Sequence, residues 1–279
     1  MRDALEFTGE RMVPEKADAN TFWEHLYRYR FAVPFVSGRR VLDIACGEGY
    51  GTAALLRAGA ASVIGVDVSA EACAHATRRY GIEARVGDAQ KIPLPDASVE
   101  VVVSFETIEH LTRPDLFLDE CVRVLAPGGV CIVSTPNREA YHEHAPANPF
   151  HVREMNEAEF TALLRARFGK IEMFTQRPKT AAWWSLRSLA GERAFWQRVR
   201  GLGLGRLRRF WQKMFCREVV DPLALARARK NPVPAILTGP GRLAHLANPF
   251  AVRRQNAATG EAAAYLVAVA SQVHAGKII

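Results

Sequence analysis

The sequence predicts an α/β fold in which a doubly wound, mostly parallel sheet carries helices on both faces. Two observations predict it. Short apolar segments with the composition of strands alternate with helical segments at short spacing, and the first strands are continuous apolar runs. Strands of that kind are buried on both faces. A chain of 279 residues, 49% of them hydrophobic, can supply the core that such a sheet needs.

Each element follows from its local sequence. Residues 21–36 form an amphipathic pattern that predicts a helix at least as far as Pro34. Apolar runs predict strands at 40–45, 62–68, 82–88, 99–105, 130–135, 170–176 and 262–270. Further helices are expected from Thr52, after Ser69 as N-cap, from Pro114 and over 156–168. The tripeptide PGG at 127–129 predicts a turn before the fifth strand.

Residues 178–255 form a basic insert between the sixth and seventh strands. They hold 16 Lys and Arg against 3 Asp and Glu, a net charge of +13, whereas the remaining 21 and 26 give −5. The insert shows no clear strand and carries four tryptophans among its arginines: Trp183, Trp184, Trp196 and Trp211. This pattern favours amphipathic helices, and the charge asymmetry indicates a local anionic partner.

Composition excludes several classes of protein. The five cysteines are scattered without a C-x-x-C pair, which argues against a disulfide scaffold or a zinc site and favours the reducing cytoplasm. We expect no secretory signal, because residues 1–10 are mixed and charged. We also expect no membrane span, because no stretch approaches about eighteen consecutive apolar residues.

A glycine-rich turn follows the first strand in the stretch VLDIACGEGYGT (41–52). Three glycines alternate along it: Gly47, Gly49 and Gly51. At this turn of a doubly wound sheet, glycines let the backbone approach a ligand, and Asp67 at the end of the second strand could accept hydrogen bonds from ribose hydroxyls. Thr52 breaks the G-x-G-x-x-G pattern of nicotinamide sites, so a different adenosyl ligand is expected.

The segments VLDIACGEGYGT, IGVDVS, VGDAQKIPLPDASVEVVVSFETIEHL and RVLAPGGVCIVSTPN resemble the motifs of class I S-adenosylmethionine-dependent methyltransferases. The resemblance covers residues 38–176 and the last strand, in order and at normal spacing. It implies a Rossmann-like sheet of seven strands, with strand seven antiparallel between strands five and six. It also implies S-adenosyl-L-methionine as the cofactor.

The same resemblance implies where the cofactor would lie. Gly47 and Gly49 would lie under its methionine part, and Asp43 would hold that loop and the amino group. Asp67 would bind the ribose hydroxyls. The remaining expected cofactor residues belong to the adenine side or follow the fourth strand: Val68, Asp88, Ala89 and Phe105.

The stretches TGERMVPE…FWEHLYRYRFA and YHEHAPANPFHVREM resemble bacterial methyltransferases found with polysaccharide and sugar-modifying genes. This narrower resemblance implies that Arg28 and Tyr29 close over the cofactor; the alternative is that their helix simply packs on the sheet. The chain then divides into three parts: an N-terminal helical cap (1–37), a cofactor-binding domain (38–177 and 256–279) and the insert (178–255), a helical lid or interaction element.

Methyl transfer to a hydroxyl requires a group that removes the proton. The loop after the fifth strand carries three histidines, and an imidazole can act as a base near neutral pH. His151 is the first candidate, because it lies next to the helix that carries the acceptor face. His142 and His144 are the others. The alternative is that all three are exposed loop residues.

The segment ETIEHL (106–111) offers a second kind of chemistry. Glu106, Glu109 and His110 match an E-x-x-E-H pattern of ubiquinone-pathway O-methyltransferases, where it can ligate a divalent cation such as Mg²⁺. On a helix these three positions would share one face, and two carboxylates with an imidazole suit a hard or borderline ion. Against a metal, relatives without one also carry the EHL tripeptide.

Together these observations predict an S-adenosylmethionine-dependent methyltransferase that O-methylates a sugar or another small hydroxylated acceptor, in polysaccharide or natural-product biosynthesis. The alternatives are N- or C-methylation of a metabolite, a non-catalytic cofactor-binding protein, and methylation of a nucleic acid through the insert, which lacks a recognisable RNA module. The insert is expected to form a lid, to recognise an anionic or lipid-linked acceptor, or to contact a membrane peripherally from the cytoplasm.

Overall fold

The computed structural model describes residues 11–17, 19–141, 148–176, 222–238, 252–254 and 264–273. Its strands are β1 Arg40–Ile44, β2 Ser62–Asp67, β3 Glu83–Val86, β4 Val99–Phe105, β5 Leu125–Pro136, β6 Phe168–Gln176, β7 Val252–Arg254 and β8 Tyr265–Val273. Its helices are α1 Ala19–Val36, α2 Tyr50–Arg57, α3 Ala70–Tyr80, the 3-10 helix η1 Ile108–His110, α4 Pro114–Val124, α5 Arg138–Tyr141, α6 Glu157–Arg165, α11 Pro222–Lys230 and α12 Pro232–Thr238.

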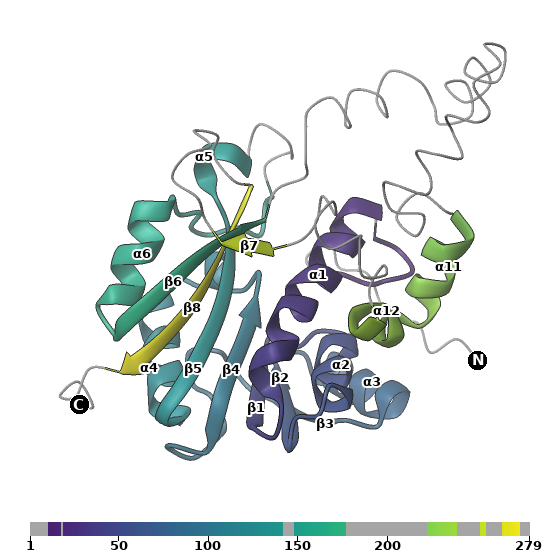
Figure 1. Ribbon diagram of the computed structural model, residues 1–279, viewed down its shortest axis with the longest axis horizontal. Coiled ribbons are helices and arrows are strands. Elements are labelled where there is room, and N and C mark those ends of the chain that lie inside the picture. Colours follow the sequence, from purple (N-terminus) through teal and green to yellow (C-terminus); the bar gives the residue numbers. More distant parts are fainter. Residues whose placement is uncertain are drawn as a thin grey trace, which may run out of the picture.

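The described strands form one sheet in the order β3-β2-β1-β4-β5-β8-β6-β7 (Figure 1). The first five strands in the chain are parallel to one another where they pair. The last strand, β8, is antiparallel and lies between β5 and β6. The expected doubly wound order, with its final strand inserted antiparallel, is therefore confirmed.

One strand lies where none was expected. β7 pairs antiparallel with the end of β6, from Gln176↔Val252 to Phe174↔Arg254, at the edge of the sheet. It belongs to the stretch 178–255, for which the sequence showed no strand. An edge strand of three residues needs only backbone hydrogen bonds on one side, so it requires no apolar run and arginines can occupy it.

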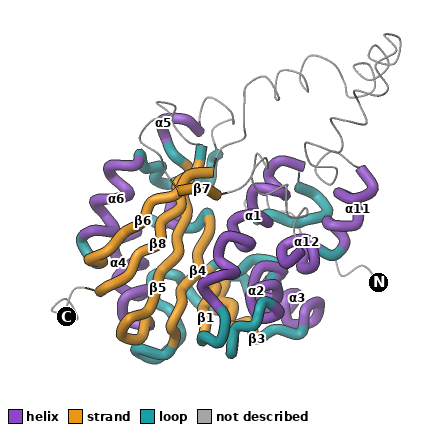
Figure 2. The backbone as a smooth tube through the Cα atoms, viewed as in Figure 1, coloured by secondary structure: helices purple, strands orange, loops and turns teal. Residues whose placement is uncertain are grey.

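The sheet is buried on both faces, as continuous apolar strands predict. Val41 and Val103 belong to one apolar cluster with α1 and α2, whereas their neighbours Leu42 and Val102 belong to a second cluster with α4 and α6. Successive side chains of a strand point to opposite faces, so this alternation separates the two cores. Figure 2 shows the strands between these helix layers.

The PGG tripeptide (127–129) lies within strand β5 and not, as predicted, in a turn before it. β5 begins at Leu125 and runs through it to Pro136. Between the pairs Val99↔Leu125 and Val101↔Val130, β4 advances by two residues and β5 by five, so the glycines form a bulge within the strand. Gly128 has φ +78°, a left-handed conformation that glycine adopts without steric cost.

Part of the insert packs on the helix layer that covers one face of the sheet. α12 packs on α1 and α2, and α11 packs on α12; Val233 and Ile236 of α12 are buried in the same apolar cluster as α1 (Figure 1). Arg30 of α1 donates to the carbonyls of Ile236 and Leu237, at 2.9 and 3.1 Å. These two helices are the part of the insert's expected helical content that the structure describes. Its four tryptophans lie outside the described residues, and the three-part division of the chain stays a prediction.

Candidate functional site

A cavity of about 590 Å³ opens at the carboxyl ends of the parallel strands. Ile44, Asp67 and Phe105 are the last residues of β1, β2 and β4, and all three line it. One face of α1 adds Thr21, His25 and Tyr29. In a doubly wound sheet, this edge is where ligands bind, because the loops after adjacent strands diverge and leave a crevice.

The three alternating glycines have three different neighbours. Gly47, with φ +55°, lines the cavity. Gly49, with φ +88°, is the N-cap of α2, and a Cβ there would lie 2.5 Å from the Cβ of Ala76 in α3. A Cβ on Gly51 would lie 2.0 Å from the Tyr29 ring. Gly47 therefore faces the ligand space, whereas close packing of helices accounts for Gly49, which was expected beneath the cofactor, and for Gly51.

Asp43 lies behind the cavity wall. It is fully buried and does not line the cavity. Its carboxylate accepts hydrogen bonds from the hydroxyls of Thr52, at 2.6 Å, and Tyr29, at 3.2 Å. Burial raises the Asp43 pKa to about 7, although both hydroxyls act in the opposite direction. Asp43 thus links α1 to α2 through Tyr29 and Thr52, and its expected contact with the cofactor amino group stays a prediction.

Asp67 lies in the cavity wall, in the position that a ribose-binding acid requires. Its Oδ2 accepts a hydrogen bond from the Gly47 N–H, at 2.8 Å, and its Oδ1 accepts one from the Ser69 N–H, at 2.9 Å. Arg11 approaches the same carboxylate at 3.8 Å. The other expected residues of the adenine side, Val68, Asp88 and Ala89, also line the cavity. Val68 is 77% exposed, so it is available to a ligand.

Tyr29 and Arg28 are neighbours in sequence with different surroundings. Tyr29 lines the cavity, and its ring meets those of Phe105 and Tyr50 edge-on. Arg28 is fully buried, stacks over Tyr265 at 4.2 Å and donates to the Gln176 side chain at 2.9 Å. Arg28 does not line the cavity; it joins α1 to β6 and β8, and its expected closure over the cofactor stays a prediction.

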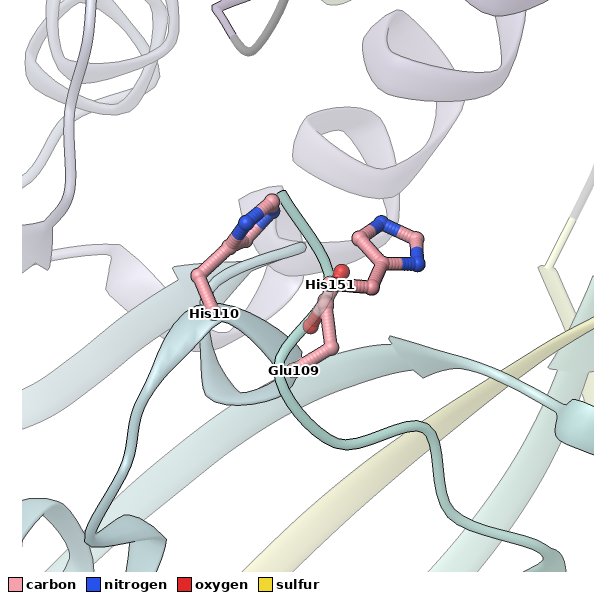
Figure 3. Close-up of side chains that lie close together, drawn as sticks. All are labelled: Glu109, His110 and His151. Carbon is pink, nitrogen blue, oxygen red and sulfur yellow. The ribbon is translucent and has the colours of Figure 1, made fainter. Parts of the chain in front are cut away.

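The segment ETIEHL is not an α-helix. Glu106 has φ +53°, and only the 3-10 helix η1 follows it. Glu106 accepts a hydrogen bond from the Ser134 hydroxyl at 2.7 Å and lies 3.7 Å from Arg28. The α-helix expected across Glu106, Glu109 and His110 is therefore not formed, although all three residues line the cavity. The group that could ligate a metal within the described residues is instead Glu109, His110 and His151, whose ligand atoms lie within 4.8 Å of one another (Figure 3).

Glu109 is the most unusual side chain of this group. It is fully buried, and neither carboxylate oxygen has a hydrogen bond of good geometry among the described residues, although the Thr135 hydroxyl and the backbone N–H of Glu109 lie near enough to favour its charged form. Burial, and then the charge of Glu106, raise the Glu109 pKa well above its ordinary value. A buried carboxyl without a hydrogen bond of good geometry is costly, so a bound cation, a substrate hydroxyl or a proton must satisfy it when the site is in use.

His151 is held on both of its ring nitrogens. Its Nδ1 lies 2.6 Å from a Glu154 carboxylate oxygen, and its Nε2 lies 3.0 Å from Nδ2 of Asn148. Because the Asn148 side-chain oxygen accepts from the Phe150 N–H, its amide nitrogen is the group that faces His151. Nδ1 therefore carries the proton and Nε2 accepts. The backbone N–H groups of Val152 and Arg153 donate to the Glu109 carbonyl, which fixes this loop against η1.

Sequence reasoning missed several residues of the site. Glu154 stands three positions after His151, a spacing that could have indicated the pair. Asn148, Tyr141, Tyr265, Thr21 and His25 also line the cavity, and no sequence signal distinguished them. His25 is half-buried, and its desolvation lowers its pKa well below the ordinary value; Arg28 adds to this shift. The other two candidate bases, His142 and His144, lie outside the described residues.

A cavity at the carboxyl edge of a doubly wound sheet, with a glycine turn after β1 and a carboxylate at the end of β2, defines a protein that binds a nucleoside-containing cofactor. The family model described as a methyltransferase domain matches residues 42–133. The chain is 46% identical over 174 residues to a probable S-adenosylmethionine-dependent methyltransferase of Mycolicibacterium smegmatis, covering 61% of this chain and 67% of that relative.

A second relative is a ubiquinone biosynthesis O-methyltransferase of Chelativorans, 37% identical over 114 residues, which cover 39% of this chain and 44% of that protein. A solved S-adenosylmethionine-dependent methyltransferase of Thermotoga maritima shares the fold, with a TM-score of 0.53, 16% identity and coverage of 89% and 91%. The chain belongs to the S-adenosylmethionine-dependent methyltransferases, and S-adenosylmethionine is its cofactor.

Proposed function

We propose that this methyltransferase transfers the methyl group to a hydroxyl oxygen of a sugar or another small hydroxylated acceptor. The observation that carries the proposal is His151, which lines the cavity beside Glu109 and His110 and whose Nδ1 lies 2.6 Å from the Glu154 carboxylate. S-adenosylmethionine, when bound, supplies a methyl group activated by a sulfonium. A hydroxyl oxygen must lose its proton to become a neutral ether, so a positioned base is useful.

Different residues of the cavity would bind the cofactor and the acceptor. Gly47, Asp67, Asp88 and Ala89 would hold the cofactor, and the Tyr29–Phe105 ring pair would fix the wall between cofactor and acceptor. The acceptor hydroxyl would replace the Asn148 amide at His151 Nε2 and pass its proton there. Glu154 would then stabilise the imidazolium through Nδ1, as a carboxylate does for a histidine base.

The acceptor end of the cavity suits a polyhydroxylated ring. Tyr141 and Tyr265 lie edge-on to each other with centroids 5.8 Å apart, and Tyr141 also packs against His151. Aromatic faces beside carboxylates and histidines can pack on the C–H surface of a ring while accepting hydrogen bonds from its hydroxyls. The similarity to a ubiquinone biosynthesis O-methyltransferase also supports oxygen as the acceptor atom.

A divalent cation such as Mg²⁺ offers a second route for removing the proton. The buried carboxylate of Glu109, with ring nitrogens of His110 and His151 nearby, suits a hard or borderline cation. A cation there would hold the acceptor hydroxyl and lower its pKa, and His151 would then be a ligand and not the base. Removal of metal distinguishes the two routes.

The basic insert supports a proposal about the acceptor's context. Its net charge of +13 would suit a phosphorylated or lipid-linked acceptor at the cytoplasmic face of an anionic membrane. No helix within the described ranges is long and apolar enough to cross a bilayer.

Sedimentation of the protein with anionic vesicles tests the membrane contact. It should fall as salt rises, and fall further after Arg206, Arg208 and Arg209 are changed to alanine. Salt-independent or absent sedimentation contradicts the membrane contact. Salt-sensitive retention of RNA would instead favour the nucleic-acid alternative.

The acceptor class can be tested directly. The enzyme with labelled S-adenosylmethionine should methylate members of a panel of sugars and sugar phosphates, and the product should contain a methyl ether by mass spectrometry and NMR. Amino and carbon acceptors of similar size serve as the comparison. Transfer to nitrogen or carbon alone would contradict the proposal, and cofactor binding with no transfer to any panel member would favour a non-catalytic role.

A further inference from the structure

Residues 11–17, called the strap here, form part of the cavity wall on the cofactor side. Arg11, Met12, Lys16 and Ala17 line the cavity, and Met12 and Ala17 are buried. Arg11 also reaches toward Asp67, at 3.8 Å. The strap therefore lies beside the carboxylate that would bind the ribose, although it precedes the sheet in the chain and has no helix or strand of its own.

Arg79, in the last turn of α3, contacts three separate segments. Its guanidinium lies 2.8 Å from the Glu15 carboxylate of the strap and 3.2 Å from the Glu48 carboxylate of the glycine turn. It also donates to the Lys230 carbonyl at the end of α11, at 3.1 Å. Glu48 lines the cavity and is itself fixed by His75, at 3.1 Å. One side chain thus joins the strap to the cofactor turn and to the insert.

Arg229 of α11 provides a second attachment. It donates a hydrogen bond to the carbonyl of Ala17, the residue at the end of the strap. The position of α11 is itself defined, because α12 follows it directly and is held on α1 by Arg30. Neither Arg79 nor Arg229 lines the cavity, so an effect of either on the cofactor must pass through the residues that it holds.

We propose that Arg79 and Arg229 are positioning residues that hold the strap against the cofactor, so that α11 of the insert contributes to cofactor affinity. A tethered strap has less conformational freedom to lose when the cofactor binds, and this raises affinity without a direct contact. The insert thereby acts on the cofactor end of the cavity through residues 222–238, a role separate from acceptor or membrane recognition.

The experiment uses the full chain and S-adenosylhomocysteine as the probe, with the dissociation constant measured by calorimetry. Arg79→Ala and Arg229→Ala should each raise it by about tenfold, the loss expected for a charged hydrogen bond. The matched controls are the neighbouring arginines in the same helices, Arg78→Ala and Arg227→Ala, which are exposed and should leave it within about twofold. Tryptic cleavage after Arg11 and Lys16 should be slowed by the probe in the parent protein and less so in the two variants.

A purely structural role gives a different result. If Arg79 and Arg229 only join α3 and α11, the variants should melt at a lower temperature while the dissociation constant and the cleavage pattern stay unchanged, and that outcome overturns the proposal. If Arg79→Ala does not fold, Glu15→Gln removes the same contact from the exposed side of the strap. Its dissociation constant should then rise by severalfold, and an unchanged value would overturn the role of Arg79.

Discussion

The Tyr29 hydroxyl lies 3.2 and 3.3 Å from the two carboxylate oxygens of Asp43, beneath the wall of the cofactor cavity. Tyr29 comes from α1 and Asp43 from β1, and Thr52 of α2 donates to the same carboxylate. The ring of Tyr29 passes directly over Gly51, where a side chain would have no room. The glycine turn is therefore shaped by a tyrosine from another segment as well as by its ligand.

Changing Gly51 to alanine should destabilise the protein by roughly 1–3 kcal/mol, because the new Cβ would lie 2.0 Å from a ring that Phe105 and Tyr50 confine. Urea unfolding measures this. Gly81→Ala is the control: its φ of +67° is strained but nothing lies within 4 Å, so only about 1 kcal/mol should be lost. In a Tyr29→Ala background the Gly51→Ala penalty should largely disappear; an unchanged penalty would show that Tyr29 is not its cause.

Asp43 should make the protein less stable as pH rises from about 4 to about 7. Its pKa is about 7 in the folded state against 3.8 for an ordinary aspartate, so the folded state keeps a proton that the unfolded state loses in this range. The loss amounts to roughly 4 kcal/mol. Asp43→Asn cannot ionise, so its stability relative to the parent should improve between about pH 5 and about pH 8 in urea unfolding. If the difference in unfolding free energy between Asp43→Asn and the parent is the same at about pH 5 and about pH 8, the raised pKa of Asp43 is contradicted.

Asp67→Ala should weaken binding of S-adenosylhomocysteine by roughly 1–3 kcal/mol, because the cofactor hydroxyls and the Gly47 N–H both lose a charged acceptor. Calorimetry measures the change. Asp119→Ala, on the exposed side of α4, is the control and should bind normally. Asp67→Asn should retain more affinity than Asp67→Ala, since one oxygen can still accept. Equal binding by all of these variants would remove Asp67 from the cofactor site.

If His151 is the base, His151→Ala should reduce turnover by roughly a hundredfold or more while the affinity for S-adenosylhomocysteine stays unchanged. Glu154→Gln should lower turnover less, because the ring keeps its position but loses the charge that stabilises an imidazolium. Glu154→Gln should also change the pH–rate profile, which a residue that only packs against His151 would leave unchanged. Normal turnover in His151→Ala would mean that His142, His144 or Glu106 removes the proton, or that no base is needed.

If a divalent cation acts at Glu109, His110 and His151, dialysis against a chelator should abolish methyl transfer, and Mg²⁺ or another divalent ion should restore it. Glu109→Gln should then require a higher metal concentration for half-maximal activity. Glu106→Gln is the informative comparison: Glu106 binds Ser134 and lies near Arg28, outside this group, and acts on Glu109 only through its charge, so this variant should change the metal requirement much less than Glu109→Gln. Full activity after chelation would favour proton removal without a metal.

Much of the fold could be predicted because its signals are local. The apolar runs defined most strands, Ser69 accepts a hydrogen bond from the Ala72 N–H as an N-cap does, and Pro114 begins α4. A residue's placement at the end of a strand also follows from the strand itself, which explains why Asp67, Phe105 and Gly47 reached the cavity as expected. The bulge at PGG and the short strand β7 were missed, because both depend on the strands that they pair with.

By itself, then, the sequence determined a doubly wound methyltransferase sheet with its cofactor edge, since strand burial and turn chemistry depend on neighbouring residues. Only the tertiary structure decided which side chains act together. It buried Arg28 among α1, β6 and β8, brought His151 beside Glu109 and His110, and brought α11 to the strap. These contacts join segments far apart in the chain, and their geometry depends on how helices and loops pack over the sheet, which no local pattern of residues specifies.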